Sequence, residues 1–143
     1  MTDIKEFNFK MDLQIRWGDL DPLGHVNNAI FVTYFEIGRS LYMLAASSKW
    51  DWFLHMFLIG DINVKFLKEL KITDPKPEIW VRTSKIGIKS FVLEYAITTT
   101  SEDEKIKIHS VGSTTQILFD TKTRQTIEIQ DWLRKDLKKY DNI

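Results

Sequence analysis

The stretch from Asn28 to about Ser48 constrains the fold more than any other, because its apolar residues recur at spacings of three and four. This period predicts an α-helix. Polar side chains are so few that the helix should be buried on most of its circumference, and Asn27 or Asn28 is a suitable N-cap. At 1.5 Å per residue the helix is roughly 30 Å long, so a sheet must curl around it. The predicted apolar stripe comprises Ile30, Tyr34, Ile37, Leu41 and Leu44, broadened by Phe31, Phe35, Tyr42 and Ala45.

Strand patterns lie on both sides of this helix. Residues 7–17 alternate between apolar and polar with a period of two, which predicts a half-buried strand. Four further strands are predicted over 59–67, 79–88, 90–100 and 106–120, separated by turn-forming or charged residues. Three segments complete the chain: an aromatic-rich stretch that fits a continued helix or a loop over a pocket mouth, a short return to the sheet, and an amphipathic terminal helix, at 49–58, 126–129 and 130–140.

These elements predict one α+β domain, with a long central helix wrapped by an antiparallel sheet of about five strands. The domain covers residues 1–143, with its core over about 7–120 and a C-terminal helix over about 130–140. One helix cannot cover such a sheet completely. We therefore expect a homodimer or a homotetramer, with strand pairing into a continuous sheet as one route to it.

The composition narrows the classes of function. Twenty basic residues balance twenty acidic ones, which argues against a nucleic-acid partner. Cysteine is absent, and His55 and His109 stand outside any metal-ligand spacing, so we expect neither a metal site nor a cofactor. The N-terminus lacks the apolar core of a signal peptide, and no apolar run approaches the ~18 residues that span a bilayer. We therefore expect a cytoplasmic protein without a membrane partner.

The run WGDLDPLGHVNN, residues 17–28, joins the first predicted strand to the helix and is rich in polar, turn-forming residues. Loops of this kind are common places for chemistry. For Asp21, a catalytic carboxylate and a structural turn or capping aspartate are both open from spacing alone. Asp19 fits a structural partner of the turn backbone, and His25 fits either a direct role or orientation of the loop.

The segment IRWGDLDPLGHVNNAIFVTYFEIGR resembles the signature of the hotdog-fold acyl-CoA thioesterases, in particular the 4-hydroxybenzoyl-CoA thioesterase-like family. That signature is an aromatic-x-Asp-x-Asp-x-x-Gly loop, then His-Val-Asn-Asn or a variant, then a Tyr-Phe-Glu helix. The resemblance implies that Asp21 is the catalytic carboxylate, acting as nucleophile or general base, and that His25 assists it. Plant-type acyl-carrier-protein thioesterases have a catalytic Asn where this chain has Leu23, so their triad does not carry over.

The resemblance also implies residues that bind coenzyme A. Family members often place a basic residue against the phosphates of coenzyme A at the start of a strand, where this chain has Lys89 and Ser90. We take these two residues, with Asn28 at the helix N-terminus, as the substrate-binding set. Glu36 sits on the central helix, where one thioesterase branch carries its catalytic Glu, but within this motif it usually belongs to the subunit interface. Core packing, an interface and the wall of an acyl pocket are alternatives for Trp50, Trp52, Phe53 and Phe57.

The predicted function is therefore acyl-CoA thioester hydrolysis, releasing a carboxylic acid and free coenzyme A. Asp21 supplies the base or nucleophile, and the N-terminus of the central helix polarises the thioester carbonyl. An acyl-acyl-carrier-protein thioesterase is one alternative, and a non-hydrolytic acyl-CoA-binding hotdog protein is another. Hydratases and dehydratases of the same fold usually pair a catalytic His with an acid in a different motif, which this sequence lacks.

Overall fold

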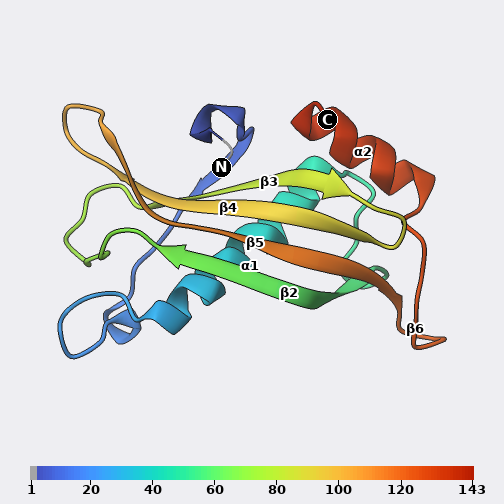
Figure 1. The fold of residues 1–143 in the computed structure, drawn as a ribbon, viewed down its shortest axis with the longest axis horizontal. Coiled ribbons are helices and arrows are strands. Elements are labelled where there is room, and N and C mark those ends of the chain that lie inside the picture. Colours follow the sequence, from blue (N-terminus) through green and yellow to red (C-terminus); the bar gives the residue numbers. More distant parts are fainter. Residues whose placement is uncertain (1–2) are drawn as a thin grey trace.

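The computed structural model describes residues 3–143 and shows a helix lying across one face of an antiparallel sheet (Figure 1). The sheet order is β1-β3-β4-β5-β2, and the short β6 pairs with β5. The predicted α+β class, with its curled antiparallel sheet and central helix, is thus confirmed. In chain order the elements are η1 (Ile4–Glu6), β1 (Phe9–Asp12), η2 (Trp17–Asp19), α1 (Asn28–Ala46), β2 (Met56–Phe66), β3 (Glu78–Ile86), β4 (Ser90–Thr100), β5 (Ile106–Asp120), β6 (Gln125–Thr126) and α2 (Asp131–Asp141).

The strand β1 is shorter than the alternation over 7–17 predicts. Its ladder with β3 ends at Asp12, because β3 itself begins at Glu78 and offers only one more acceptor, the carbonyl of Pro77, to the amide of Leu13. The chain then turns into the 3₁₀ helix η2. The apolar–polar alternation of the sequence continues beyond the point where β3 can pair with β1, so the predicted strand is longer than the observed one.

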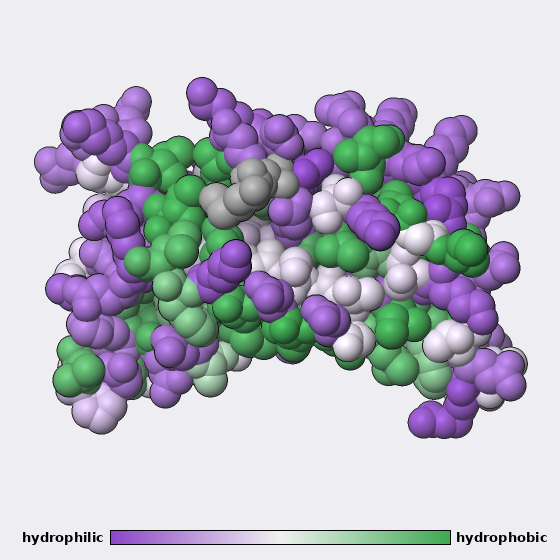
Figure 2. All heavy atoms as spheres, in the orientation of Figure 1, coloured by the Kyte–Doolittle hydropathy of each residue, from purple (hydrophilic) through white to green (hydrophobic). Residues whose placement is uncertain are grey.

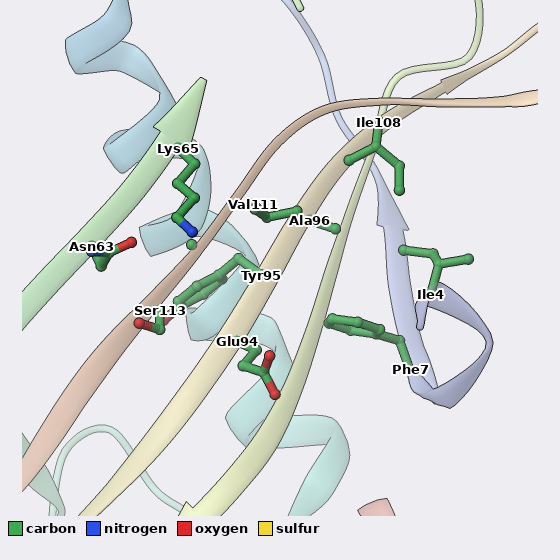
Figure 3. A pocket seen from close by; sticks show the side chains of 11 residues that line it. Ile4, Phe7, Asn63, Lys65, Glu94, Tyr95, Ala96, Ile108, Val111 and Ser113 are labelled. Atoms are coloured by element: carbon green, nitrogen blue, oxygen red, sulfur yellow. The ribbon is translucent and has the colours of Figure 1, made fainter. Parts of the chain in front are cut away.

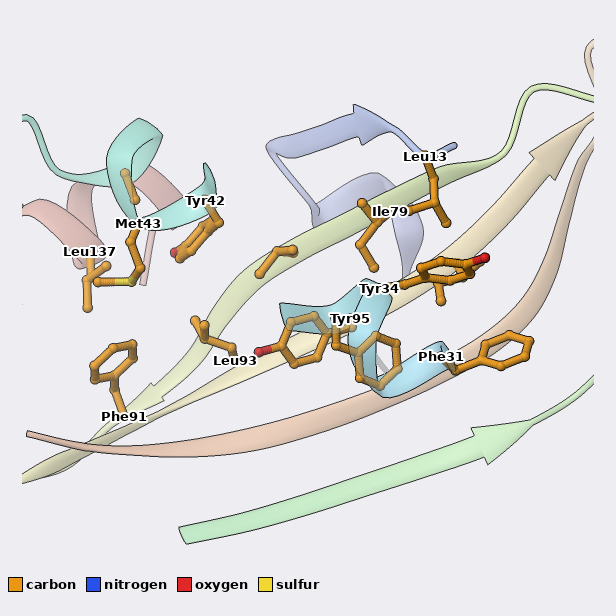
Figure 4. Packing of buried hydrophobic residues seen from close by; sticks show 14 of the residues in the cluster. Leu13, Phe31, Tyr34, Tyr42, Met43, Ile79, Phe91, Leu93, Tyr95 and Leu137 are labelled. Atoms are coloured by element: carbon orange, nitrogen blue, oxygen red, sulfur yellow. The ribbon is translucent and has the colours of Figure 1, made fainter. Parts of the chain in front are cut away.

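The face of α1 that packs on the sheet coincides with only part of the predicted stripe. The helix is apolar on two sides, so its period alone does not select one of them. Close packing selects it: Phe35 stacks on Tyr95 at 4.5 Å, and a Cβ at Gly38 would lie only 2.7 Å from Cγ1 of Ile79. Figure 4 shows Tyr34 and Tyr42 of α1 in the same buried cluster as Ile79 and Tyr95 of the sheet. The buried face therefore includes Phe31, Tyr34, Phe35, Gly38, Tyr42 and Met43, whereas 41%, 46% and 47% of Ile37, Leu41 and Leu44 are exposed.

The C-terminal helix α2 lies beside β3 and the end of α1 (Figure 1). The side chains of Leu133 and Leu137, which belong to α2, are buried. Its last residue, Asp141, is buried and accepts hydrogen bonds from the Tyr42 hydroxyl and, at 2.8 Å, from the Thr83 amide. This carboxylate ties α2 to α1 and β3 at once.

The other face of the sheet is turned toward the viewer in Figure 2, and neither helix covers it. Apolar and weakly polar residues run across its middle with several hydrophilic residues among them, and hydrophilic residues also line its edge. Among the described residues, no helix combines the length and the apolar character needed to cross a bilayer.

Candidate functional site

The loop before α1 is built on Asp19, whose side chain is buried. Its carboxylate accepts hydrogen bonds from the Arg16 amide at 3.0 Å, the Arg16 guanidinium at 3.2 Å and the Tyr34 hydroxyl at 2.7 Å. Its carbonyl accepts from the Asn27 amide at 2.9 Å. Burial raises the pKa of Asp19, but these hydrogen bonds outweigh it and hold the pKa below its usual value. Asp19 therefore joins the two ends of the loop to the helix.

Asp21 lies at the centre of that loop, in a tight turn. Its Oδ1 accepts from the amides of Leu23 at 2.9 Å and His25 at 3.1 Å, while its own amide donates to the His25 carbonyl at 2.7 Å. Gly24 completes the turn with a φ of +81°, a conformation that glycine adopts at little cost. None of the hydrogen bonds recorded within residues 3–143 engages Oδ2 of Asp21. One carboxylate oxygen of Asp21 thus fixes the turn, and the other has no hydrogen-bond partner among the described residues.

Asn27 caps α1, as one of the two predicted residues. Its Oδ1 accepts from the Ala29 amide at 2.9 Å, and its carbonyl accepts from the Ile30 amide at 2.9 Å. The Asn28 amide, at the first helical position, has no recorded partner among the described residues. The helix N-terminus therefore offers the Asn28 amide and its partial positive charge directly beside the Asp21 turn.

A cavity of about 250 Å³ opens between this loop and the segment that follows β2. It brings together three of the predicted site residues, Asp21, His25 and Asn28. On the facing wall, Oε2 of Glu69 lies 2.9 Å from Nε2 of His25. The full lining is Asp21, His25, Val26, Asn28, Phe31, Phe66, Leu67, Lys68, Glu69 and Leu70.

Sequence reasoning did not find Glu69. The pairing between His25 and Lys71, and the hydrogen bond from the Val26 amide to the Leu70 carbonyl at 2.8 Å, join segments more than forty residues apart. A motif of consecutive residues cannot predict a contact between segments so far apart in the sequence. Only the charged run that follows the second predicted strand marks this segment in the sequence.

Of the predicted coenzyme-binding pair, Lys89 lies in the turn between β3 and β4 and Ser90 is the first residue of β4, and both lie outside this cavity. Ser90 pairs with Ile117, and Ile117 with Leu58 on β2, whereas the cavity lies at the Phe66 end of that strand. Eight residues of strand, at ~3.3 Å each, separate these levels by roughly 25 Å. Within one subunit, the structure does not bring Lys89 and Ser90 together with Asp21.

Two other hollows contain none of the predicted catalytic residues. One, of about 220 Å³, lies on the outer face of the sheet, where Lys65, Glu94 and Phe7 surround short side chains (Figure 3). The other, of about 260 Å³, is aromatic and lies between the loop after α1 and the start of α2. Trp50 is buried beside it, while Phe53 is almost fully exposed, so this aromatic group divides between core and surface.

The remaining histidines have structural partners. Nε2 of His109 pairs with the Thr99 hydroxyl at 2.7 Å, and its Nδ1 with the Glu69 carbonyl at 2.9 Å, all within the interior. Burial lowers the pKa of His109 and keeps the ring neutral. Nδ1 of His55 accepts from the Asp51 amide at 3.0 Å. Across residues 3–143, no three His, Asp or Glu side chains gather in a way that could hold a metal ion.

Comparison with known proteins identifies the family. The model of the thioesterase-like superfamily matches residues 15–137, which include the Asp21 loop, α1 and the whole sheet beyond β1. The chain belongs to the thioesterase-like superfamily. It is therefore a thioester hydrolase, as the sequence predicted. No curated protein matches the sequence.

Solved structures of thioesterases share the hotdog fold of this superfamily member. A thioesterase from Thermus thermophilus, complexed with coenzyme A and zinc, is 24% identical, with a TM-score of 0.83 and coverage of 97% of this chain and 98% of that one. The 4-hydroxybenzoyl-CoA thioesterase from Pseudomonas sp. strain CBS-3 is 17% identical, with a TM-score of 0.78 and coverage of 90% and 97%. A mutant 4-hydroxybenzoyl-CoA thioesterase complexed with 4-hydroxybenzoyl-CoA is 15% identical, with a TM-score of 0.82 and the same coverage. These likenesses confirm the predicted hotdog fold.

Proposed function

We propose that this thioesterase hydrolyses acyl-CoA, and that Asp21 is its catalytic carboxylate. The observation that carries the proposal is the Asp21 turn, which holds Oδ1 on the amides of Leu23 and His25 and presents the carboxylate to the cavity beside the N-terminus of α1. Coenzyme A as the thiol is supported by structural relatives that are complexed with coenzyme A or with an acyl-CoA.

Two routes use the same geometry. In the first, Asp21 takes a proton from water as the water oxygen adds to the thioester carbonyl, the C–S bond breaks, and coenzyme A leaves as its thiolate. In the second, Oδ2 of Asp21 adds to the carbonyl, the thiolate leaves, and water then hydrolyses the mixed anhydride. In both, the carbonyl oxygen gains negative charge, which the Asn28 amide at the helix N-terminus is placed to stabilise.

The edge of β2 supports association of two copies. Within the described residues β2 pairs only with β5, and an exposed edge strand is normally covered or blocked by charge. No other strand covers this edge among the described residues, and although β2 carries the exposed Asp61 and Lys65, several of its apolar side chains are 43–49% exposed, namely Met56, Leu58, Ile62 and Phe66. Antiparallel pairing of two β2 strands about a two-fold axis would give a continuous sheet and cover the edge.

Such pairing also explains Lys89. A two-fold axis through the middle of β2 brings the Leu58 end of one copy beside the Phe66 end of the other. Ser90 is level with Leu58, so Lys89 of a second copy lies at the same end of the joined sheet as Asp21. A coenzyme whose thioester meets Asp21 of one subunit then reaches a basic side chain of the other.

The test is a panel of acyl-CoA substrates, with free thiol measured, on the wild type and Asp21→Asn. The amide retains an acceptor for the Leu23 and His25 amides, so the fold should persist, but it removes the base and nucleophile. We expect a loss of roughly 10²–10⁴-fold in kcat. Asp12→Asn, an exposed aspartate on β1, is the matched control and should retain full activity. Turnover by Asp21→Asn near that of the wild type would sink the assignment.

The acyl-carrier-protein alternative is separated by supplying the same acyl group on both carriers. The proposal requires that the coenzyme A thioester be hydrolysed at least as fast as the carrier-protein thioester of the same acyl group. Turnover restricted to the carrier protein would replace the proposed substrate but leave the role of Asp21 open to the same variant test.

A further inference from the structure

We infer that Glu69 is a positioning residue of this site, acting through His25, and that it fixes the ring with its proton on Nε2. The inference rests on the proposed function, since it assigns a role within the cavity that contains Asp21. It concerns a residue that neither the loop motif nor the comparisons point to.

The first support is the contact itself. Nε2 of His25 lies 2.9 Å from Oε2 of Glu69, and Nζ of Lys71 lies 3.3 Å from Oε1. Each carboxylate oxygen therefore has one partner, and a carboxylate can only accept. A ring nitrogen this close to a carboxylate oxygen is favoured in its protonated form, which in a neutral His25 ring puts the lone pair on Nδ1.

The second support is the rigidity of the segment that carries Glu69. A surface ion pair by itself contributes little, because its side chains are free to separate. Here the backbone is held at successive positions. The amides of Leu67 and Lys68 both donate to the His109 carbonyl, at 2.8 and 3.1 Å, and the buried His109 ring bonds the Glu69 carbonyl at 2.9 Å. The neighbouring Leu70 is completely buried.

The His25 side is held as firmly. Its amide donates to Oδ1 of Asp21 at 3.1 Å, and its carbonyl accepts from the Asp21 amide at 2.7 Å. The ring is therefore fixed at the backbone by Asp21 and at Nε2 by Glu69, on opposite walls of one cavity of about 250 Å³. A ring held at both ends offers Nδ1 in a constant orientation, as required of a group that orients the hydrolytic water beside Asp21.

Charged groups of both signs surround the His25 ring. Asp21 and Glu69 are the carboxylates that line it, and Lys68 and Lys71 are the nearby cations, so positive and negative side chains balance around His25. Lys71 also contacts Oε1 of Glu69, so the Glu69 carboxylate lies between the His25 ring and a cation.

A double-mutant cycle tests this role. Loss of an orienting partner typically costs 10–100-fold in activity, so Glu69→Ala should lower kcat by about that factor with KM nearly unchanged. If Glu69 acts through His25, the double variant Glu69→Ala/His25→Ala should be no slower than His25→Ala alone. Glu69→Gln, which keeps an acceptor for Nε2, should retain most of the activity. Glu102→Gln, an exposed carboxylate on the β4–β5 turn, is the matched control.

The tautomer provides a readout that does not depend on turnover. Nitrogen-15 NMR of the His25 ring should show the proton on Nε2 in the wild type and a mixture of tautomers in Glu69→Ala. A wild-type ring protonated on Nδ1 alone, or additive losses in the double-mutant cycle, would overturn the inference. Full activity of Glu69→Ala alongside an inactive Asp21→Asn would refute the role of Glu69 and leave the proposed function intact. A wild type that cleaves no thioester would refute the proposed function instead, and NMR would still decide the tautomer.

Discussion

Gly112, on β5, is the position where the smallest addition should do the most damage to the sheet. A Cβ built there would lie 2.5 Å from the carbonyl oxygen of Asn63 on β2 and 2.5 Å from Cε2 of Phe35 on α1. Ordinary contacts begin near 3.4 Å, so each neighbour must retreat by roughly 1 Å. One neighbour is backbone, and the other is a fully buried ring stacked on Tyr95.

The magnitude of Gly112→Ala follows from these contacts. Overpacking a dense core costs about 1–3 kcal/mol, and disturbing the Phe35–Tyr95 stack puts a further ~0.5–1.5 kcal/mol at risk. Against this, alanine reduces the entropy of the unfolded chain, which returns about 0.4–1 kcal/mol. We therefore expect a net destabilisation of about 2 kcal/mol. For a domain of this size that corresponds to a fall in Tm of roughly 6–10 °C.

Thermal unfolding followed by circular dichroism measures this loss directly. Gly18→Ala is the matched control, because a Cβ there would meet no atom within 4 Å and its backbone needs no positive φ. Its free energy of unfolding should change by no more than an ordinary surface substitution allows, about ±0.5 kcal/mol, so its Tm should stay close to that of the wild type. Adding Phe35→Leu to Gly112→Ala removes ring atoms from the collision and should recover part of the stability. An unchanged or higher Tm for Gly112→Ala would refute the argument from close packing.

Two predictions concern pH. Burial lowers the pKa of His109 in the folded state, so the unfolded chain binds more protons than the folded one at pH values near and below 6.5. The free energy of unfolding should therefore decrease as the pH falls through that range. His109→Gln should flatten this pH dependence, as measured by urea unfolding. Burial raises the pKa of Asp141, against the opposing hydrogen bonds from Tyr42 and Thr83, so the native state binds more protons just above the ordinary value of 3.8. Stability should therefore fall as the pH rises from 3.8 through the raised pKa, and Asp141→Asn should remove that fall in the same measurement.

The accuracy of the sequence prediction depended on how locally each element is specified. The strands over 90–100 and 106–120 have the predicted bounds, because turn-forming residues flank alternating patterns on both sides. The helix also begins where Asn27 caps it. The first strand was predicted too long, and the predicted stripe of α1 wrongly included Ile37, Leu41 and Leu44, since both features depend on partners that lie far away in the sequence.

The candidate site divides in the same way. Asp21, His25 and Asn28 lie within eight residues, so a loop motif is enough to place them together. Glu69 reaches them only through pairing between the loop and the chain after β2. Lys89 lies at the far end of the sheet from Asp21, so its predicted place in the site rests on the proposed pairing of two copies. Distance along the chain thus decides which members of the site a motif reveals.

The structural and catalytic readings of Asp21 are not alternatives. A carboxylate free in solvent would rotate and be poorly oriented toward a thioester. The two amide hydrogen bonds to Oδ1 fix its plane, and the buried Asp19 fixes the loop that carries it by bonding Arg16, Tyr34 and the Asn27 amide. Because a carboxylate has two oxygens, the turn uses one and the reaction can use the other. The hydrogen bonds that make Asp21 a structural residue therefore also fix the orientation of its carboxylate, which the proposed catalytic role requires.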